Sequence, residues 1–385
     1  MKTTKFFPLC IVLMLTVFSS CKKNDESSTT TVDQDKSNIQ SSFDGFIDNL
    51  QQIKSGTFYE AVVDFYGIKN DEATNQDWVD NIGDELGSVI DGEELFSDGR
   101  FNYSQLCNKY SWNINSETWS KTANATPLVL FPGSKSSTTN NCEFGFTAYK
   151  DKSVEINGDN DYLPTTAKLY LNKNNSKILS LDLEASYNTY GIPTTANVEL
   201  FVSPATLKLS TSRITDSKYT LSLSLQNNEN KNNSFSLSTD VVFSKEINSY
   251  EDVNGLKVNS INLTATQGEL KISGSADIKS LLEIDENAGV TANDLNKYIS
   301  ATVYYKNSLT GTLKMKKVDG EFYVFIVYKD GSEENTSVYY KDFISDLESI
   351  FETPFDVKAV QSIIKKQIVK SKINHIKQNL LFWKN

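Results

Sequence analysis

The feature that most constrains this chain is a period-two alternation of apolar and polar residues, which runs from about Phe101 to Tyr340. In residues 179–187 and 219–226, leucines at every second position alternate with serine, threonine and charged or amide residues. Successive side chains of a strand point to opposite faces of its sheet. The pattern therefore predicts many strands that each have one apolar and one solvated face.

Short clusters of Asn, Asp and Gly separate the alternating segments. Asp319-Gly320 and Asp330-Gly331 are typical of two-residue hairpin turns, in which both central residues need a positive φ. Segments of this length and spacing predict about thirteen to fifteen strands, joined as a meander.

Helical periodicity appears at both ends of the alternating region. Apolar residues at three- and four-residue steps predict amphipathic helices over 39–53, 78–95 and 343–351. The apolar sheet face needs a cover, and these helices are the available one. We therefore expect a mainly β (α+β) fold: a large curved antiparallel sheet or half-barrel meander, with helices at the N- and C-terminal ends packed on its apolar face. A two-sheet sandwich is the alternative. The segment Phe322–Tyr328 is apolar on both faces, which predicts a central strand covered on both sides.

The first residues have the order of a signal peptide. Lys2 and Lys5 precede an apolar run from Phe6 to Phe18, followed by Ser19, Ser20 and Cys21. A run of about 13 residues is too short for a membrane-spanning helix, which needs roughly 20. The segment Phe18-Ser19-Ser20-Cys21 resembles a bacterial lipobox, although Phe18 stands where leucine is usual. The resemblance implies cleavage by signal peptidase II after residue 20 and lipidation of Cys21.

The residues after Cys21 suggest where the anchored protein goes. Lys22-Lys23-Asn24-Asp25-Glu26 resembles the signal that sends lipoproteins of Bacteroidota to the cell surface, which implies an outer-membrane lipoprotein exposed outside the cell. A periplasmic location, with these residues only beginning a solvated linker, is the alternative. Residues 21–37 are predicted to form a flexible tether.

Two further segments complete the expected organisation. Residues 38–352 form a single β-rich domain with N-terminal helices, and residues 353–385 form a basic amphipathic helix with seven lysines and no acidic residue after Val357. That helix could lie on an anionic membrane or dock on the acidic domain.

Charge and histidine content argue against several classes of function. Without Lys2 and Lys5 the mature chain has 36 basic residues against 49 acidic ones, which disfavours a nucleic-acid partner. The single histidine, His375, lies in the tail and weakens serine hydrolase, zinc and haem interpretations together. We therefore expect a non-enzymatic protein with no catalytic residues, no cofactor and no metal site.

Two groups of residues are candidate sites in the domain. Cys107 and Cys142 could form a disulfide in an oxidising compartment, although Cys142 also fits as a small buried thiol. Tyr110 and Trp112 share one face of a predicted strand, and Trp119 follows beyond a turn. These three aromatics could form a flat platform for a sugar ring or an apolar ligand, or could belong to the sheet core.

A family resemblance adds context. The lipobox is accompanied by Tyr110-Ser111-Trp112-Asn113, Glu117-Thr118-Trp119, Leu130-Phe131-Pro132 and Val327-Tyr328-Lys329-Asp330-Gly331. In combination these motifs are similar to a group of uncharacterised Bacteroidota lipoproteins, over roughly residues 1–352. The resemblance implies a lipid anchor and a curved sheet, and it supplies no catalytic residues.

The sequence therefore predicts a membrane-anchored lipoprotein that binds or presents a hydrophobic ligand or a protein partner. A glycan-binding or glycan-processing lipoprotein and a structural envelope component are the alternatives.

Overall fold

The computed structural model describes residues 31–67, 76–90, 95–97, 99–156, 158–230, 234–284 and 290–339. The signal segment, Cys21, the helix predicted at 343–351 and the basic tail lie outside these residues. Among the described helices, none combines the length and the apolarity that a membrane crossing requires.

The predicted fold class is confirmed. One open sheet of sixteen strands has the order β18-β17-β16-β15-β14-β13-β12-β11-β10-β9-β8-β7-β6-β5-β3-β4, and a few helices accompany it. A single large sheet takes the place of the alternative sandwich. The described residues divide into two compact units, one of residues 31–61 with residues 146–339 and the other of residues 62–145, so that the boundary falls within β6. Each unit is described separately below.

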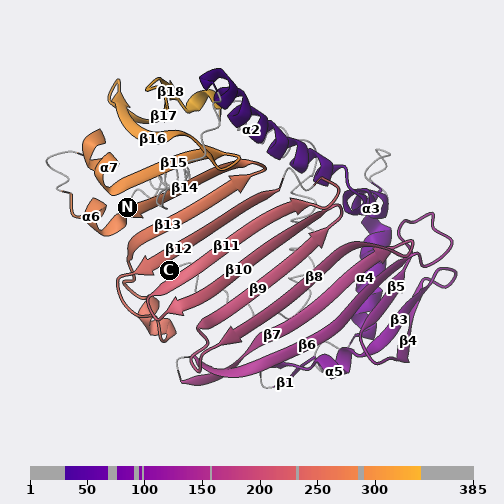
Figure 1. Cartoon of the computed structure of the whole chain (residues 1–385). Coiled ribbons are helices and arrows are strands. Elements are labelled where there is room, and N and C mark those ends of the chain that lie inside the picture. The colour runs from indigo at the N-terminus through magenta and orange to yellow at the C-terminus, as the bar shows by residue number, and fades with distance from the viewer. Residues whose placement is uncertain are drawn as a thin grey trace. The chain divides into compact units, whose positions relative to one another are not determined.

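The first unit is built on an antiparallel meander in which each strand pairs with the next one along the chain (Figure 1). Its strands are β6 (Cys142–Ile156), β7 (Asp159–Lys173), β8 (Ser176–Tyr187), β9 (Pro193–Val202), β10 (Ala205–Thr215), β11 (Lys218–Asn227), β12 (Phe235–Phe243), β13 (Val258–Gln267), β14 (Leu270–Asp277), β15 (Ile299–Tyr305), β16 (Ser308–Val318), β17 (Glu321–Tyr328) and β18 (Glu333–Asn335).

Helix α2 (Val32–Lys54) crosses this sheet at one end of its strands (Figure 1). The helix begins at Val32 because the Thr31 side chain accepts a hydrogen bond from the backbone nitrogen of Gln34 at 3.3 Å, and two acids in the first turn favour the positive end of the helix dipole. The tether predicted over 21–37 is therefore too long by six residues. The predicted first helix is confirmed, and it extends beyond 39–53 at its N-terminal end.

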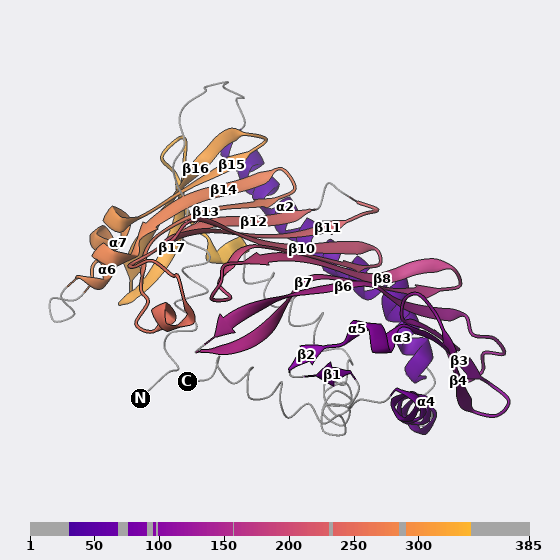
Figure 2. The same cartoon turned by 90° about the horizontal axis from the view of Figure 1, so that it is seen from below.

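Smaller helices lie at the opposite ends of the later strands. Figure 2 shows α6 (Ile278–Leu282) and α7 (Ala292–Tyr298) next to each other, and they contact β13 and β16 respectively. A short 3-10 turn, η4 (Tyr250–Val253), lies in the β12–β13 connection.

The segment Phe322–Tyr328 forms β17, as predicted, but the expected central position is wrong. β17 is next to the edge, because its outer neighbour β18 has only three residues. On its second face, the Lys316 ammonium lies 5.3 Å from the centroid of the Phe325 ring.

The second unit holds the other elements. They are α4 (Gln76–Val89), the two-stranded pair β1 (Phe96–Ser97) and β2 (Arg100–Phe101), α5 (Tyr103–Leu106), β3 (Asn108–Asn113), β4 (Thr118–Ala123) and β5 (Leu128–Phe131). β3 pairs in parallel with β5, whereas the other strand pairings are antiparallel. The predicted helix at 78–95 is confirmed but ends at Val89. Helix α3 (Thr57–Tyr66), which spans the unit boundary, was not predicted.

Candidate functional site

Strand register in the first unit places apolar side chains in rows that cross the sheet. One such row, which we call the apolar row, is formed by residues that pair directly from strand to strand: Ile272, Ala265, Leu237, Leu223, Leu209, Val198 and Leu183. Neighbouring strands are about 4.8 Å apart, so the row spans about 29 Å.

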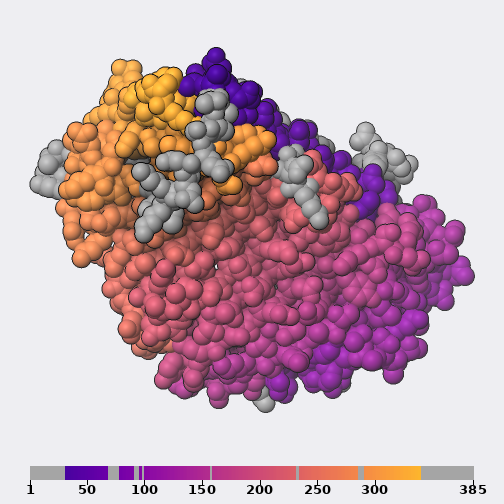
Figure 3. Space-filling view, viewed as in Figure 1, coloured from indigo at the N-terminus to yellow at the C-terminus, as the bar shows by residue number. Residues whose placement is uncertain are grey.

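The apolar row is only partly covered. Leu209 is 45% exposed, and Leu221, in the adjacent row of the same face, is 42% exposed. The other members of the apolar row are half-buried. Figure 3 shows one face of the molecule, on which the atoms of the middle strands form a continuous surface. Leu209 and Leu221 lie on the neighbouring strands β10 and β11, and exposed apolar side chains that gather on one face mark interaction or ligand sites.

The opposite face of the same strands has a different chemistry. Hydroxyl and carboxylate side chains pair across it: Thr220 donates to Asp240 at 2.6 Å, and Ser222 donates to Ser238 at 3.3 Å. Ionic pairs such as Lys208 with Glu199, 2.8 Å apart, continue this polar surface. The predicted contrast between an apolar and a solvated face is therefore confirmed, and exposed leucines occur on the face where the strands carry few polar groups.

Helix α2 covers the row next to the apolar row. Ile39 packs in a buried cluster with Leu270, Val303 and Ile326, and the Phe46 ring meets the Phe235 ring edge-on at 5.5 Å. The other end of the helix is fixed by Asn227, whose side-chain amide donates to Gln52.

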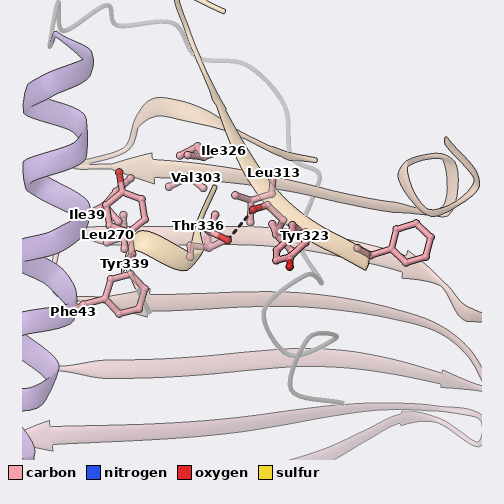
Figure 4. A pocket seen from close by; sticks show the side chains of 12 residues that line it. Ile39, Phe43, Leu270, Val303, Leu313, Tyr323, Ile326, Thr336 and Tyr339 are labelled. Carbon is pink, nitrogen blue, oxygen red and sulfur yellow. Dashed lines mark hydrogen bonds between the residues drawn. The ribbon is translucent and has the colours of Figure 1, made fainter. Parts of the chain in front are cut away.

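A cavity of about 100 Å³ lies beneath the N-terminal half of α2. Figure 4 shows Ile39 and Phe43 extending from the helix toward Leu270 and Tyr339. Strands β14 to β17 and the turn after β18 supply the other walls. The residues that line it are Ile39, Phe43, Leu270, Ile272, Val303, Leu313, Phe322, Tyr323, Val324, Ile326, Thr336 and Tyr339. Since Ile272 is also the first residue of the apolar row, the two features are continuous.

The hydroxyl groups of the cavity lining already have hydrogen-bond partners. Thr336 donates to the Val324 carbonyl at 3.0 Å, drawn as a dashed line in Figure 4, and Tyr323 donates to Glu321 at 3.1 Å. The Tyr339 hydroxyl bonds to Tyr328 and Glu334. The remaining lining residues are aliphatic or phenylalanine, so the interior suits hydrocarbon.

A polar cluster beside the cavity joins α2 to the sheet edge. The Lys36 ammonium donates to Glu334 at 2.9 Å. Burial raises the pKa of Tyr328 and of Tyr339, and their hydrogen bonds within the cluster add to the effect for Tyr328. Burial also acts to raise the pKa of Glu334, but hydrogen bonds from Tyr339, Lys36 and Tyr328 outweigh it and the net change is downward. Glu334 is therefore a carboxylate and both phenols are neutral near pH 7.

Of the two alternatives for the aromatic group, a ligand platform or the sheet core, the structure shows the core. Tyr110, Trp112 and Trp119 are 1%, 3% and 8% exposed, and they form a core cluster with Ile82 of α4. The Trp119 indole nitrogen donates to the Ile82 carbonyl at 2.9 Å. Alternation along β3 correctly placed Tyr110 and Trp112 on one face, but that face is the one covered by α4. These rings cannot stack on a sugar or bind an apolar ligand.

The candidate disulfide is not formed. Cys107 and Cys142 both carry thiols in the structure. Cys107 follows α5, where its thiol donates to the Tyr103 carbonyl at 3.4 Å, and burial raises its pKa. Cys142 begins β6 and is buried, as expected for the alternative of a small core thiol.

The remaining predictions concern the lipidated cysteine, the single histidine and a metal site. Cys21 and His375 lie outside the described residues. Within the described ranges, no group of three or more His, Cys, Asp or Glu residues is placed to hold a metal ion. Comparison of the chain with protein-family models, with curated proteins and with solved structures gives no match.

The residues of the apolar row and the cavity were not singled out from the sequence. Alternation gave the face of each leucine, but the register that aligns Leu209 with Leu223 and Leu237 depends on turn geometry. The cavity depends on which strands lie beneath α2, and the alternation pattern does not specify where the helix packs on the sheet.

Proposed function

We propose that this protein is a non-enzymatic, membrane-anchored lipoprotein of the outer membrane that binds the acyl chain of a lipid or fatty acid on the apolar face of its sheet. The observation that carries the proposal is the continuity of the apolar row with the cavity beneath α2. A ligand chain lying along the row would have its far end enclosed between α2 and β14–β17.

The energetics favour such a ligand. Each methylene moved from water onto an apolar surface contributes about 0.8 kcal/mol when fully buried. The cavity alone holds only a few carbons, since a cavity of roughly 150 Å³ accommodates benzene. The exposed leucines of the row supply the additional contact that affinity for a longer chain requires.

Binding of palmitate tests the proposal. The mature chain carrying Cys21→Ser would be titrated with a fluorescent fatty acid that palmitate displaces, and lipid co-purified from cells would be identified by mass spectrometry after extraction. We expect saturable binding by this protein. A glutamate at position 209 would place a charge in the middle of the row, so we expect Leu209→Glu to weaken binding at least about tenfold.

A matched control separates this effect from a general one. Leu309 is 43% exposed, like Leu209, but its strand partner Tyr304 pairs with Lys271 on the polar face. Leu309→Glu is expected to leave the affinity unchanged. If the protein binds no palmitate and no lipid co-purifies with it, the proposed function is wrong. If Leu209→Glu and Leu309→Glu lose the same affinity for palmitate, the apolar row is not the binding surface.

The anchor and its location need separate experiments. We infer lipidation from the lipobox, so an alkyne analogue of palmitate fed to cells should label the protein, and Cys21→Ser should abolish the label. Protease added to intact cells should degrade the protein if it faces outward. Protection until the outer membrane is opened would instead place it in the periplasm.

A further inference from the structure

The charged side chain of Arg213 lies on the apolar face of the first unit. Arg213 of β10 pairs with Tyr219 of β11, and its side chain is 10% exposed. Tyr219 packs in a buried cluster with Ile192 and Ile247, against which Phe243 also lies. Arg213 is one of only two arginines in the sequence. A charge so far removed from water requires compensating partners.

The partners of Arg213 accept from only some of the hydrogen-bond donors of its guanidinium group. Nη2 donates to Asp216 at 2.7 Å and to Asn248 at 2.7 Å. Nε is buried and has no acceptor. The Asp216 side chain is 55% exposed, so solvent screens its attraction for Arg213.

The hydroxyl of Tyr219 is a second buried donor without an acceptor. Burial raises its pKa, so the phenol is neutral and carries a proton to donate. A guanidinium has only donors. Two buried donors on directly paired residues therefore lack an acceptor, and each such group left unsatisfied costs roughly 1–3 kcal/mol.

We propose that this end of the apolar face holds the carboxylate of a long-chain fatty acid, with its oxygens accepting from Arg213 Nε and from the Tyr219 hydroxyl. The proposal rests on the proposed function and specifies the ligand's head group. A carboxylate supplies the missing acceptors and the negative charge that Arg213 favours. The apolar residues around Tyr219 lower the local dielectric, which strengthens a charged hydrogen bond.

The register gives the path of the chain. Along β10 and β11, the pair Thr211 and Leu221 comes next, followed by Leu209 and Leu223 of the apolar row. Residues two apart on a strand are about 6.8 Å apart, so the row is reached about 14 Å from the head group. Leu221 and Leu209 are the two exposed leucines of this face, and they lie where an acyl chain would pass.

The test compares palmitate with hexadecanol, which has the same chain and no charge. The Cys21→Ser protein is expected to bind the acid at least about tenfold more tightly than the alcohol, as charged hydrogen bonds allow. Tyr219→Phe removes only a hydroxyl without a partner, so it should not destabilise the fold, yet it should reduce the preference for the acid. Arg213→Met should abolish that preference.

A control and the opposing outcomes complete the test. Tyr304→Phe, on the polar face, should leave the preference unchanged. Equal affinity for palmitate and hexadecanol would overturn the carboxylate site but leave acyl-chain binding intact. A preference for palmitate that survives both Tyr219→Phe and Arg213→Met would overturn the carboxylate site in the same way. A bound water would then be the acceptor in place of the carboxylate. If neither ligand binds, the proposed function fails and this inference fails with it.

Discussion

The hydroxyl oxygens of Tyr328 and Tyr339 lie 2.7 Å apart, and both phenols also bond to the carboxylate of Glu334. Lys36, in the first turn of α2, donates to the same carboxylate. The cluster thus joins the start of the helix to β17, β18 and the turn that follows them. Because Ile39 and Phe43 follow Lys36 on α2, the cluster also fixes one wall of the cavity.

The substitution Glu334→Gln should show how much this cluster stabilises the fold. We expect the free energy of unfolding at pH 7 to fall by about 1–3 kcal/mol, as for loss of hydrogen bonds to a charged group. The folded-state pKa of Glu334 is lowered. Its contribution is therefore present above the unfolded-state pKa of about 4.3 and is lost as the pH falls through the lower folded-state value. Urea unfolding at pH 7 and at pH 3 measures both effects, and the wild type should lose more stability on acidification than the variant.

Glu333→Gln, which breaks an exposed ion pair with Lys316, should change stability by less than about 0.5 kcal/mol.

A glycine at the C-terminal end of α2 is needed for the helix to approach the sheet. A Cβ on Gly56 would lie 2.2 Å from the Ser203 carbonyl oxygen and 2.6 Å from Pro204 Cδ. Gly56→Ala is expected to lower the free energy of unfolding by about 1–3 kcal/mol through overpacking. In Gly87→Ala, inside α4, the new methyl group meets nothing within 4 Å. That variant should be more stable by about 0.5–1 kcal/mol, since alanine favours the helix. Thermal unfolding of the two variants should move in opposite directions, and a neutral Gly56→Ala would contradict the close approach.

The tryptophans of the second unit should behave as core residues. Trp119→Phe removes the donor to the buried Ile82 carbonyl, so we expect a loss of about 1–3 kcal/mol. Trp112→Ala should cost about 3–5 kcal/mol because it leaves a cavity in the same cluster. Both are measured by denaturant unfolding followed by circular dichroism. A Trp112→Ala protein of unchanged stability would restore the idea of an exposed platform.

The two domain cysteines should differ in reactivity. Cys107 is partly exposed with a raised pKa, so a maleimide should modify it more slowly than a free thiol in solution but faster than buried Cys142. Intact-mass measurement of the Cys21→Ser protein should show both thiols in the native state and no bond between them. A mass two hydrogens lower, converted by a reductant, would show that a disulfide forms after all.

How far the sequence predicted these features depends on the range of the interactions involved. Alternation is a local pattern. The residues around Leu181, Leu223 and Leu237 therefore sufficed to predict strands β8, β11 and β12 and the face on which their leucines lie. Alternation does not say which face another element covers, so the sequence left open whether Trp112 lies in an exposed platform or in the core. The parallel pairing of β3 with β5 and the position of β17 beside a three-residue edge strand are long-range and left no local signal.

The sequence carries a local signal at Arg213. It occurs at a position where alternation from Leu207 and Leu209 calls for an apolar residue, and Tyr219 follows just beyond the turn. A charge on the apolar side of a strand is a local inconsistency, and such inconsistencies concentrate at functional sites. Asp216, in the turn between them, accounts for only part of what the guanidinium can donate.

The order of strands in the meander has a consequence for how the chain assembles. From β6 to β18 each strand pairs with its successor, so hairpins can be added one after another, with longer connections only between β12 and β13 and between β14 and β15. Helix α2 is different: it is synthesised before the sheet, yet its partners β13, β14 and β15 come more than 200 residues later, as Val32 and Val258 show. During that interval the growing sheet exposes leucines that nothing yet shields. The folding intermediate is therefore expected to expose more apolar surface than the finished protein, and to aggregate more readily, until its first helix packs on its last strands.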